Sequence, residues 1–154
     1  MASVHPLFKT TSKLILATLL SLWSWSSQAE QSQDFGDYVV HFNALPTSFI
    51  SNEVAKQYGI TRSKTRVLLN ISVLKKVLGT SSAPVTAIVK ARATNLTGQL
   101  KDIPTRKVSE GQAIYYLGEL RVADEETLNF EIEVTPKGME APYTVKFRQQ
   151  FFTD

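Results

Sequence analysis

The most regular run of strand-forming residues in the chain is Arg66-Val67-Leu68-Leu69-Asn70-Ile71-Ser72-Val73. Its odd-numbered positions are all aliphatic, and Asn70 and Ser72 alternate with them. Successive side chains of a strand point to opposite faces, so this period of two directs one apolar row to a core and a mixed row away from it. The run predicts a central strand, and the other alternating segments are expected to pair with it or to pack across from it.

The first 29 residues contain the three parts of a secretory signal peptide. Lys9 and Lys13 precede the uncharged run 14–23, and Ser27-Gln28-Ala29 supplies small residues before a cleavage site. An uncleaved membrane anchor is the alternative. However, the charge-free segment 14–29 has only 16 residues, several of them polar, whereas a spanning helix needs about 20 apolar residues. The sequence therefore predicts export, cleavage before Glu30 and one domain over residues 30–154.

Charge and cysteine content restrict the classes of partner. The full chain has 17 Lys and Arg against 14 Asp and Glu, a net charge of +3. Without Lys9 and Lys13 the net charge is about +1, so it gives no reason to expect nucleic acid or a membrane surface as partner. The chain has no Cys, which excludes disulfides and a cysteine-linked lipid anchor. The exported domain must therefore be stabilised by its apolar core.

Six further segments alternate as strands do. They are residues 35–42, 84–94, 99–108, 113–122, 127–135 and 143–151. The segment 84–94 has small residues on its inward face, which leaves room for large aromatic side chains. Pro104 interrupts 99–108 and favours an edge position for it. The segment that begins at Ala113 is apolar on both faces, and the last two segments are expected to form a hairpin with opposite charges facing each other on its solvent side.

One short helix is predicted between the first two strands. Ser51 suits the N-cap, Glu53 suits the first turn, and Gly59 provides a left-handed stop. Its apolar residues can share one side and cover one end of a sheet: Phe49, Ile50, Val54 and Tyr58. Seven short strands, separated by turn signals and joined by a single short helix, predict an all-β fold, a seven-stranded antiparallel immunoglobulin-like β-sandwich.

Eight short motifs mark the exported segment: Thr47-Ser48-Phe49, Glu53-Val54-Ala55, Tyr58-Gly59-Ile60, Arg62-Ser63-Lys64, Asn70-Ile71-x-Val73, Ala93-Thr94-Asn95-Leu96-x-Gly98-Gln99-Leu100, Ala113-Ile114-Tyr115-Tyr116-Leu117 and Pro142-Tyr143-Thr144-Val145-x-Phe147-x-Gln149. Together they resemble a family of small exported proteins of Gram-negative bacteria that is classified as a domain of unknown function. Ser51-Asn52 departs from the family's proline at the helix start, which affects capping alone. The resemblance implies a periplasmic β-sandwich and supplies neither an activity nor site residues.

The sequence offers little for catalysis. After cleavage His41 is the remaining histidine, and its place within a strand is typical of a packed or solvent-facing side chain. Nucleophilic catalysis needs a base beside the nucleophile, and the ligand spacings of zinc and calcium sites and the Gly-rich phosphate loops are missing. The acidic turn 124–126 is interpreted as a solvated turn rather than a weak Ca²⁺ site. We expect neither a metal nor a cofactor.

Two features point to binding. Arg62, Lys64 and Arg66 place three cations in the loop before the central strand, which suits an anionic ligand or the acidic patch of a partner protein. The alternative for this loop is a solvated connection that keeps the strand end from pairing with other chains. Phe49 and Tyr58 flank the helix and can line a groove, whereas most other aromatic residues are needed to fill the sandwich.

Three hypotheses of function follow, in order of preference. The first is a non-enzymatic binding or assembly module of the cell envelope, which meets an envelope protein or an anionic ligand through loop 60–66 and the adjoining helix. The second is an envelope hydrolase that uses carboxylates such as Asp34, Asp37 or Glu53. The third is a chaperone-like protein that offers its edge strand, residues 99–108, to an extended segment of another chain.

Overall fold

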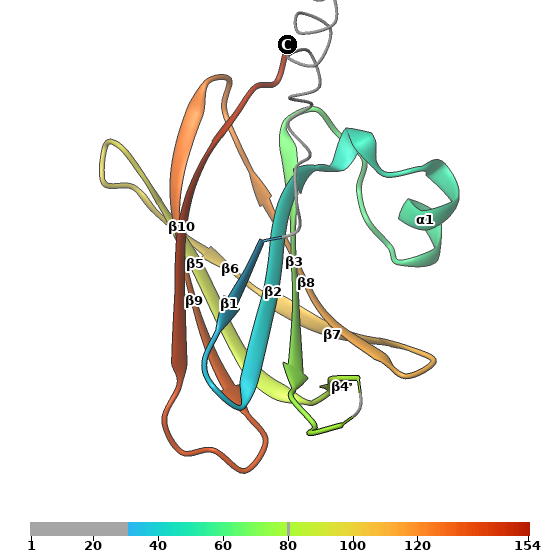
Figure 1. Cartoon of the computed structure of the whole chain (residues 1–154). Helices are drawn as coiled ribbons and strands as arrows, with labels where there is room; N and C mark the ends of the chain where they lie inside the picture. The colour runs from blue at the N-terminus through green and yellow to red at the C-terminus, as the bar shows by residue number, and fades with distance from the viewer. Residues whose placement is uncertain (1–30, 80) are drawn as a thin grey trace, which may run out of the picture.

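The structure is a computed structural model that describes residues 31–79 and 81–154, so the predicted signal peptide lies outside the described residues. Ten strands are present in this part of the chain: β1 Gln31–Asp34, β2 Tyr38–Pro46, β3 Arg66–Lys75, β4 Ala83–Pro84, β5 Ala87–Asn95, β6 Leu100–Ile103, β7 Thr105–Glu110, β8 Ala113–Arg121, β9 Glu126–Pro136 and β10 Tyr143–Phe151. They form two antiparallel sheets, sheet A with the order β1-β2-β3-β8-β7 and β4 also paired to β3, and sheet B with the order β10-β9-β5-β6 (Figure 1).

The strand order is that of an immunoglobulin-like sandwich. β2-β3-β8-β7 corresponds to strands A-B-E-D of that fold, and β10-β9-β5-β6 corresponds to G-F-C-C′. The predicted fold class is confirmed, although the described chain has ten strands instead of seven. Two of the additional strands, β1 and β4, are only four and two residues long. The polar lead before the first predicted strand forms β1, which pairs with β2.

The chain changes sheets inside two segments that the sequence presents as continuous strands. Pro84 pairs with Leu74 in sheet A, whereas Ala87 begins the pairing with β9 in sheet B. Pro104 separates β6, the edge of sheet B, from β7, the edge of sheet A. The prediction of one continuous edge strand over 99–108 was therefore wrong, because the segment forms two edge strands in different sheets. Proline cannot donate to a ladder, and Pro104 marks the point where the chain crosses.

The core lies between the sheets, with β3 in the middle of sheet A as predicted. Val67, Leu69, Ile71 and Val73 are fully buried, and β3 pairs with β2 on one side and β8 on the other. On β9 the row of even-numbered apolar residues is buried in the same way: Leu128, Phe130, Ile132 and Val134. The small inward residues Ala91 and Ala93 of β5 are buried in the same core.

The predicted hairpin of β9 and β10 is confirmed in its register. Lys146 pairs with Glu131 across the two strands, and its Nζ lies 3.0 Å from the Glu131 carboxylate. Arg92 of β5 contacts the same carboxylate from the other side. Hydrogen bonds from Lys146 and Arg92 lower the pKa of Glu131. Because these side chains are substantially exposed, they align the strands rather than supply much stability.

A short helical segment covers part of the outer face of sheet A. It consists of the 3₁₀ turn η1 (Thr47–Phe49) and the helix α1 (Asn52–Gln57), which projects to one side of the sandwich (Figure 1). The predicted N-cap and stop are confirmed, because Ser51 Oγ accepts a hydrogen bond from Val54 N at 3.3 Å and Gly59 has a φ of 61°. In the part of the chain described, no helix is long and apolar enough to cross a bilayer.

The helical segment has its own apolar cluster, separate from the core. Ile50, Ala55 and Ile60 pack on the outward side chains of β3 and β8. Phe49 does not join them and is 80% exposed, and Val54 is 42% exposed. The predicted lid thus exists, but only part of its apolar side is buried.

Candidate functional site

A groove of about 300 Å³ lies between α1 and the outer face of sheet A. We call it the α1 groove. Its described lining residues are Leu45, Ile50, Val54, Tyr58, Ile60, Leu68, Asn70, Val108, Glu110, Tyr115 and Leu117. Nine of these are aliphatic or aromatic, and the polar ones are Asn70 and Glu110. Its volume is at the lower end of the range of about 300–1,000 Å³ that is typical of ligand pockets.

The groove exists because α1 is much shorter than the sheet beneath it. With six residues the helix spans about 9 Å, whereas the ten residues of β3 span about 33 Å. The helix therefore covers the outer face near Leu68 and leaves the surface toward Asn70 and Tyr115 open. The residues of β3 and β8 that form the floor are the ones that alternate with the core-facing rows, which explains why both faces of the predicted strand 113–122 are apolar.

Asn70 contributes a polar group with unused hydrogen-bonding capacity to this apolar floor. Its Oδ1 is buried and, among the described residues, is the buried side-chain polar atom that has no hydrogen-bond partner. Leaving such an acceptor unpaired costs about 1–3 kcal/mol. In the sequence, Asn70 is a single amide side chain within a mostly aliphatic run. The alternating pattern alone gave no reason to assign it a function.

The rim of the groove next to β7 is fixed by Tyr58. The Tyr58 hydroxyl donates a hydrogen bond to the carboxylate of Glu110, and Arg106 donates to the Tyr58 carbonyl oxygen. The hydrogen bond to Glu110 raises the pKa of the Tyr58 phenol. Both contacts tie the C-terminal end of α1 to β7. Of the two aromatic residues expected to line a groove, Tyr58 lines the α1 groove and Phe49 does not.

The three cations of loop 60–66 share no common partner. Arg62 donates to Asn52 Oδ1 and, at 3.0 Å, to the Ser48 carbonyl oxygen. Arg66 Nη1 lies 3.4 Å from a carboxylate oxygen of Glu119. Within the described chain Lys64 makes no hydrogen bond or ion pair, and it is exposed. The cations therefore do not converge on one point, and their role in binding stays a prediction.

Sequence reasoning missed the residue that holds this loop in place. Thr47 is completely buried, and its hydroxyl lies 2.9 Å from the Thr61 carbonyl oxygen and 3.1 Å from that of Ser63. The same oxygen accepts a hydrogen bond from Ser63 N at 2.9 Å. One buried threonine thus links η1 to the loop before β3, and nothing in its local sequence distinguishes it from an exposed one.

The carboxylates of the hydrolase hypothesis do not meet in the α1 groove. Asp34 lies at the end of β1, where Lys76 Nζ is 2.5 Å from its Oδ2, and this hydrogen bond lowers the Asp34 pKa. Asp37 follows in the β1–β2 turn, and Glu53 lies in the first turn of α1. None of the three lines the groove. In the described residues there is also no group of three or more His, Cys, Asp or Glu that could hold a metal ion.

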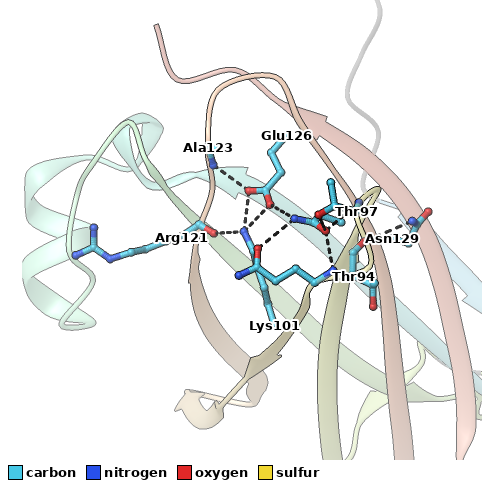
Figure 2. Close-up of polar contacts among 9 residues, drawn as sticks. Thr94, Thr97, Lys101, Arg121, Ala123, Glu126 and Asn129 are labelled. Carbon is cyan, nitrogen blue, oxygen red and sulfur yellow. Dashed lines mark hydrogen bonds and ion pairs between the residues drawn. The ribbon is translucent and has the colours of Figure 1, made fainter.

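The interpretation of the acidic turn 124–126 as solvated was wrong for Glu126. Its side chain is only 10% exposed, and a carboxylate oxygen lies 2.7 Å from Lys101 Nζ (Figure 2). Ala123 N and Asn95 Nδ2 also donate to it, at 2.9 Å and 3.2 Å. Burial raises the pKa of Glu126, but the three hydrogen bonds together outweigh burial and lower it. The carboxylate therefore has a structural role.

Comparison with known proteins places these features in a family. Residues 32–154 match the family model DUF4426, described as a domain of unknown function. The chain belongs to the DUF4426 family. A crystal structure of a DUF4426 protein from Pseudomonas aeruginosa is 39% identical in sequence and aligns with a TM-score of 0.71 over 83% of this chain and 98% of that chain. The resemblance drawn from the sequence motifs is confirmed.

This DUF4426 chain also resembles FetP of uropathogenic Escherichia coli in fold. One FetP structure, of protein expressed in the periplasm, aligns with a TM-score of 0.57 and 10% identity over 80% of this chain and 93% of that chain. A copper-bound FetP variant aligns with a TM-score of 0.56 and 11% identity over 82% and 97%. At this identity the likeness concerns the fold alone. Among proteins of curated function, none matches the chain.

Proposed function

We propose that this DUF4426 protein is a non-enzymatic binding or assembly module of the cell envelope, and that the α1 groove receives the apolar part of its partner. The observation that carries the proposal is the apolar groove under a short helix, with the unpaired amide oxygen of Asn70 in its floor. Concave, mostly apolar surfaces with few polar groups are typical of binding sites.

The residues that the sequence singled out belong to this surface or border it. Tyr58 lines the groove, and exposed Phe49 directly precedes Ile50 in its wall. Arg62, Lys64 and Arg66 lie in the loop that leads from α1 into β3. We assign to this loop the polar contacts around the apolar anchor, because the rim of an interface is normally polar and solvated.

The proposal includes a periplasmic location. It rests on the predicted signal peptide of residues 1–29. The mass of the protein recovered from a periplasmic fraction tests it. Cleavage yields a chain that begins at Glu30, whereas an intact N-terminus contradicts the processing.

Site-specific photo-crosslinking in living cells tests the binding surface. A photoreactive benzoylphenylalanine replaces Phe49 beside the groove or, as the matched control, Ile88, which is 66% exposed on the outer face of sheet B. We expect a defined crosslinked species from the first position alone. Adding Val54→Glu, which places a charge in the groove wall, should remove that species. Capture that is equal at both positions, or unchanged by Val54→Glu, contradicts the proposal.

A second candidate function is the capture of an extended segment by an edge strand. It is favoured by the position of β7, which is the last strand of sheet A and also lines the groove through Val108 and Glu110. An added strand would hydrogen-bond to β7 and place alternate side chains beside the groove. Slow amide exchange along the outer edge of β7 in the isolated protein would argue against this candidate.

Copper binding is not carried over from the FetP variant. Copper sites in proteins are built from imidazole, thiolate and thioether ligands. The full chain has no Cys, two His and two Met, and the described residues hold no group of ligands for a metal ion. The residues present do not fit such a site.

A further inference from the structure

We infer that the protein associates with a second copy of itself through the outer edge of β7, and that the two β7 strands pair antiparallel about a two-fold axis at Val108. This pairing does not depend on what the α1 groove binds, so it goes beyond the proposed function. Three features of β7 lead to it: its open edge, the geometry of its hairpin turn and the order of its charges.

The outer edge of β7 is open. β7 is the last strand of sheet A, with β8 on its other side. In Figure 1 the two strands form a hairpin that extends away from the body of the sandwich. Apart from the ladder with β8, no backbone hydrogen bond joins β7 to another of the described residues. Such an edge presents unpaired N–H and C=O groups to any strand that approaches it.

The hairpin turn determines which backbone groups of β7 face this edge. Glu110 and Ala113 flank a two-residue loop, in which Gly111 has a φ of 58°. Glycine with a positive φ at the first loop position is typical of a type II′ hairpin, whose flanking residues hydrogen-bond to each other. Pairs along an antiparallel ladder alternate between hydrogen-bonded and non-hydrogen-bonded, so every second residue of β7 bonds to β8. The residues that direct their N–H and C=O groups to the open edge are therefore Thr105, Lys107 and Ser109.

The charged residues on the groove side of β7 have capacity for a further partner. Arg106 and Glu110 are exposed and lie two positions before and two positions after Val108. Arg106 donates to the Tyr58 carbonyl oxygen, and Glu110 accepts from the Tyr58 hydroxyl. Neither forms an ion pair within the described part of the chain. A guanidinium has five N–H donors and a carboxylate has two oxygens, so both can form an ion pair without losing Tyr58.

One register of a two-fold pairing matches these charges. With the axis at Val108, Arg106 of each copy faces Glu110 of the other, the two Val108 side chains meet, and Lys107 exchanges backbone hydrogen bonds with Ser109. An axis at Lys107, Arg106 or Glu110 places like charges directly opposite each other. An axis at Ser109 leaves the arginine and the glutamate unmatched. Charge complementarity therefore selects a second copy in the register centred on Val108.

The other sheet edges suit such a pairing less. β1 and β6 have four residues each, against six in β7. β10 has nine residues, but its charged residues are Lys146 and Arg148, both cations. Symmetric pairing about the middle of β10 would bring these like charges together. Length and complementary charge thus coincide at β7.

The pairing has consequences for both candidate functions. The two-fold axis is perpendicular to sheet A, so the α1 grooves of the two copies open on the same face. Because Val108 lines the groove, the two grooves adjoin across the Val108 pair. An edge that holds a second copy is closed to an extended segment of another protein. Pairing of one short strand gives a small interface, so we expect a dimer that dissociates on dilution.

Sedimentation velocity of the exported protein over a dilution series tests the association. We expect a monomer–dimer equilibrium in the unmodified protein. Arg106→Glu or Glu110→Arg places like charges opposite each other at both ends of the pairing and should weaken the dimer at least about tenfold. Lys137→Glu, in the exposed loop after β9, is the matched charge reversal and should leave the dimer unchanged.

An equimolar mixture of Arg106→Glu and Glu110→Arg is the decisive sample. The two acidic residues of one variant then face the two arginines of the other, so a heterodimer should form although each variant alone is monomeric. Mixing would not repair a dimer lost through a disturbed α1, because each variant would keep its own disturbance. A monomer at every concentration, a dimer that survives either reversal, or a mixture that stays monomeric overturns the inference.

A disulfide across the axis tests the register. The chain has no Cys, so Val108→Cys introduces a single thiol. Facing Cβ atoms of a non-hydrogen-bonded antiparallel pair are about 4.5–5.5 Å apart, close to the distance of about 3.5–4.5 Å in disulfides. Oxidation with diamide should give a covalent dimer from Val108→Cys and none from Ile88→Cys, which is 66% exposed on sheet B. Equal yields from the two variants, or no crosslink from Val108→Cys, contradict the axis at Val108.

Discussion

Lys101 Nζ of β6 lies 2.7 Å from the carboxylate of Glu126, the first residue of β9. Lys101 lies on the same side of β6 as buried Ile103, so its side chain follows the core-facing row. Its Nζ also donates to the Arg121 carbonyl oxygen of β8 at 3.0 Å. The two side chains are only 20% and 10% exposed. Lys101 thus pairs with Glu126 inside sheet B and connects that sheet to sheet A through its hydrogen bond to β8.

Lys101→Met should lower the free energy of unfolding by about 2–3 kcal/mol, because it leaves a largely buried carboxylate without its cation. Urea denaturation measures this loss. The matched control is Lys146→Met, which breaks an ion pair in which Lys146 is 69% exposed and should cost less than about 1 kcal/mol. Equal losses in the two variants would show that Lys101 adds nothing beyond a surface pair.

The stability that Glu126 contributes should disappear in acid. Because the folded-state pKa of Glu126 is lowered from its ordinary value of 4.5, its contribution is complete above that value and is lost as the pH falls through the folded pKa. The difference in unfolding free energy between the unmodified protein and Glu126→Gln should therefore narrow from about pH 7 to about pH 3. Urea titrations at several pH values measure it, and a constant difference would contradict the assigned pKa direction.

Thr47→Val should destabilise the protein by about 2 kcal/mol, although the two side chains have nearly the same shape. The substitution leaves Ser63 N and the Thr61 carbonyl oxygen without the hydroxyl that they contact. Amide exchange in loop 60–66 should also become faster. Thr144→Val, at an exposed position of β10, is the control and should change stability by less than about 0.5 kcal/mol.

Gly118→Ala should cost about 2 kcal/mol, because the close approach of β8 to the β6–β7 crossing leaves no room for a methyl group. A Cβ at Gly118 would lie 2.6 Å from Ile103 Cγ2 and 3.2 Å from the Pro104 carbonyl oxygen. Gly111→Ala is the contrast: its surroundings are open and its φ is 58°, so conformation alone opposes it, at about 1 kcal/mol. Thermal unfolding of both variants measures the two costs separately, the steric cost at Gly118 and the conformational cost at Gly111.

Asn70→Leu should stabilise the isolated protein by about 1 kcal/mol, because it removes an unpaired buried acceptor and adds apolar contact with the groove floor. Urea denaturation of the isolated protein measures this gain. A large loss of stability in this variant would instead assign Asn70 a structural role.

The strands with one fully buried face were predictable from sequence, because burial enforces strict alternation. This holds for β3, for β9 and for the hairpin that β9 forms with β10. The helix was predictable from its ends, since Ser51 and Gly59 act through local hydrogen bonds and local backbone conformation. The family resemblance rested on motifs along the chain and needed no structure.

The sheet crossings and the groove were not predictable, for two different reasons. Alternation continues unbroken through Val85 and Thr86, so the pattern does not reveal that the chain leaves one sheet for the other. The groove combines the helix with four strands that are distant in sequence. In the same way, Arg66 has its ion-pair partner in Glu119, which no spacing rule connects to the loop.

The apolar residues form two clusters, one between the sheets and one beneath α1, and the two share no member. Side chains beneath the helix are therefore not themselves part of the packing between the sheets. Natural variation can change the side chains beneath α1 while the core between the sheets stays the same. A scaffold divided in this way can diversify its partners across species without first losing the ability to fold.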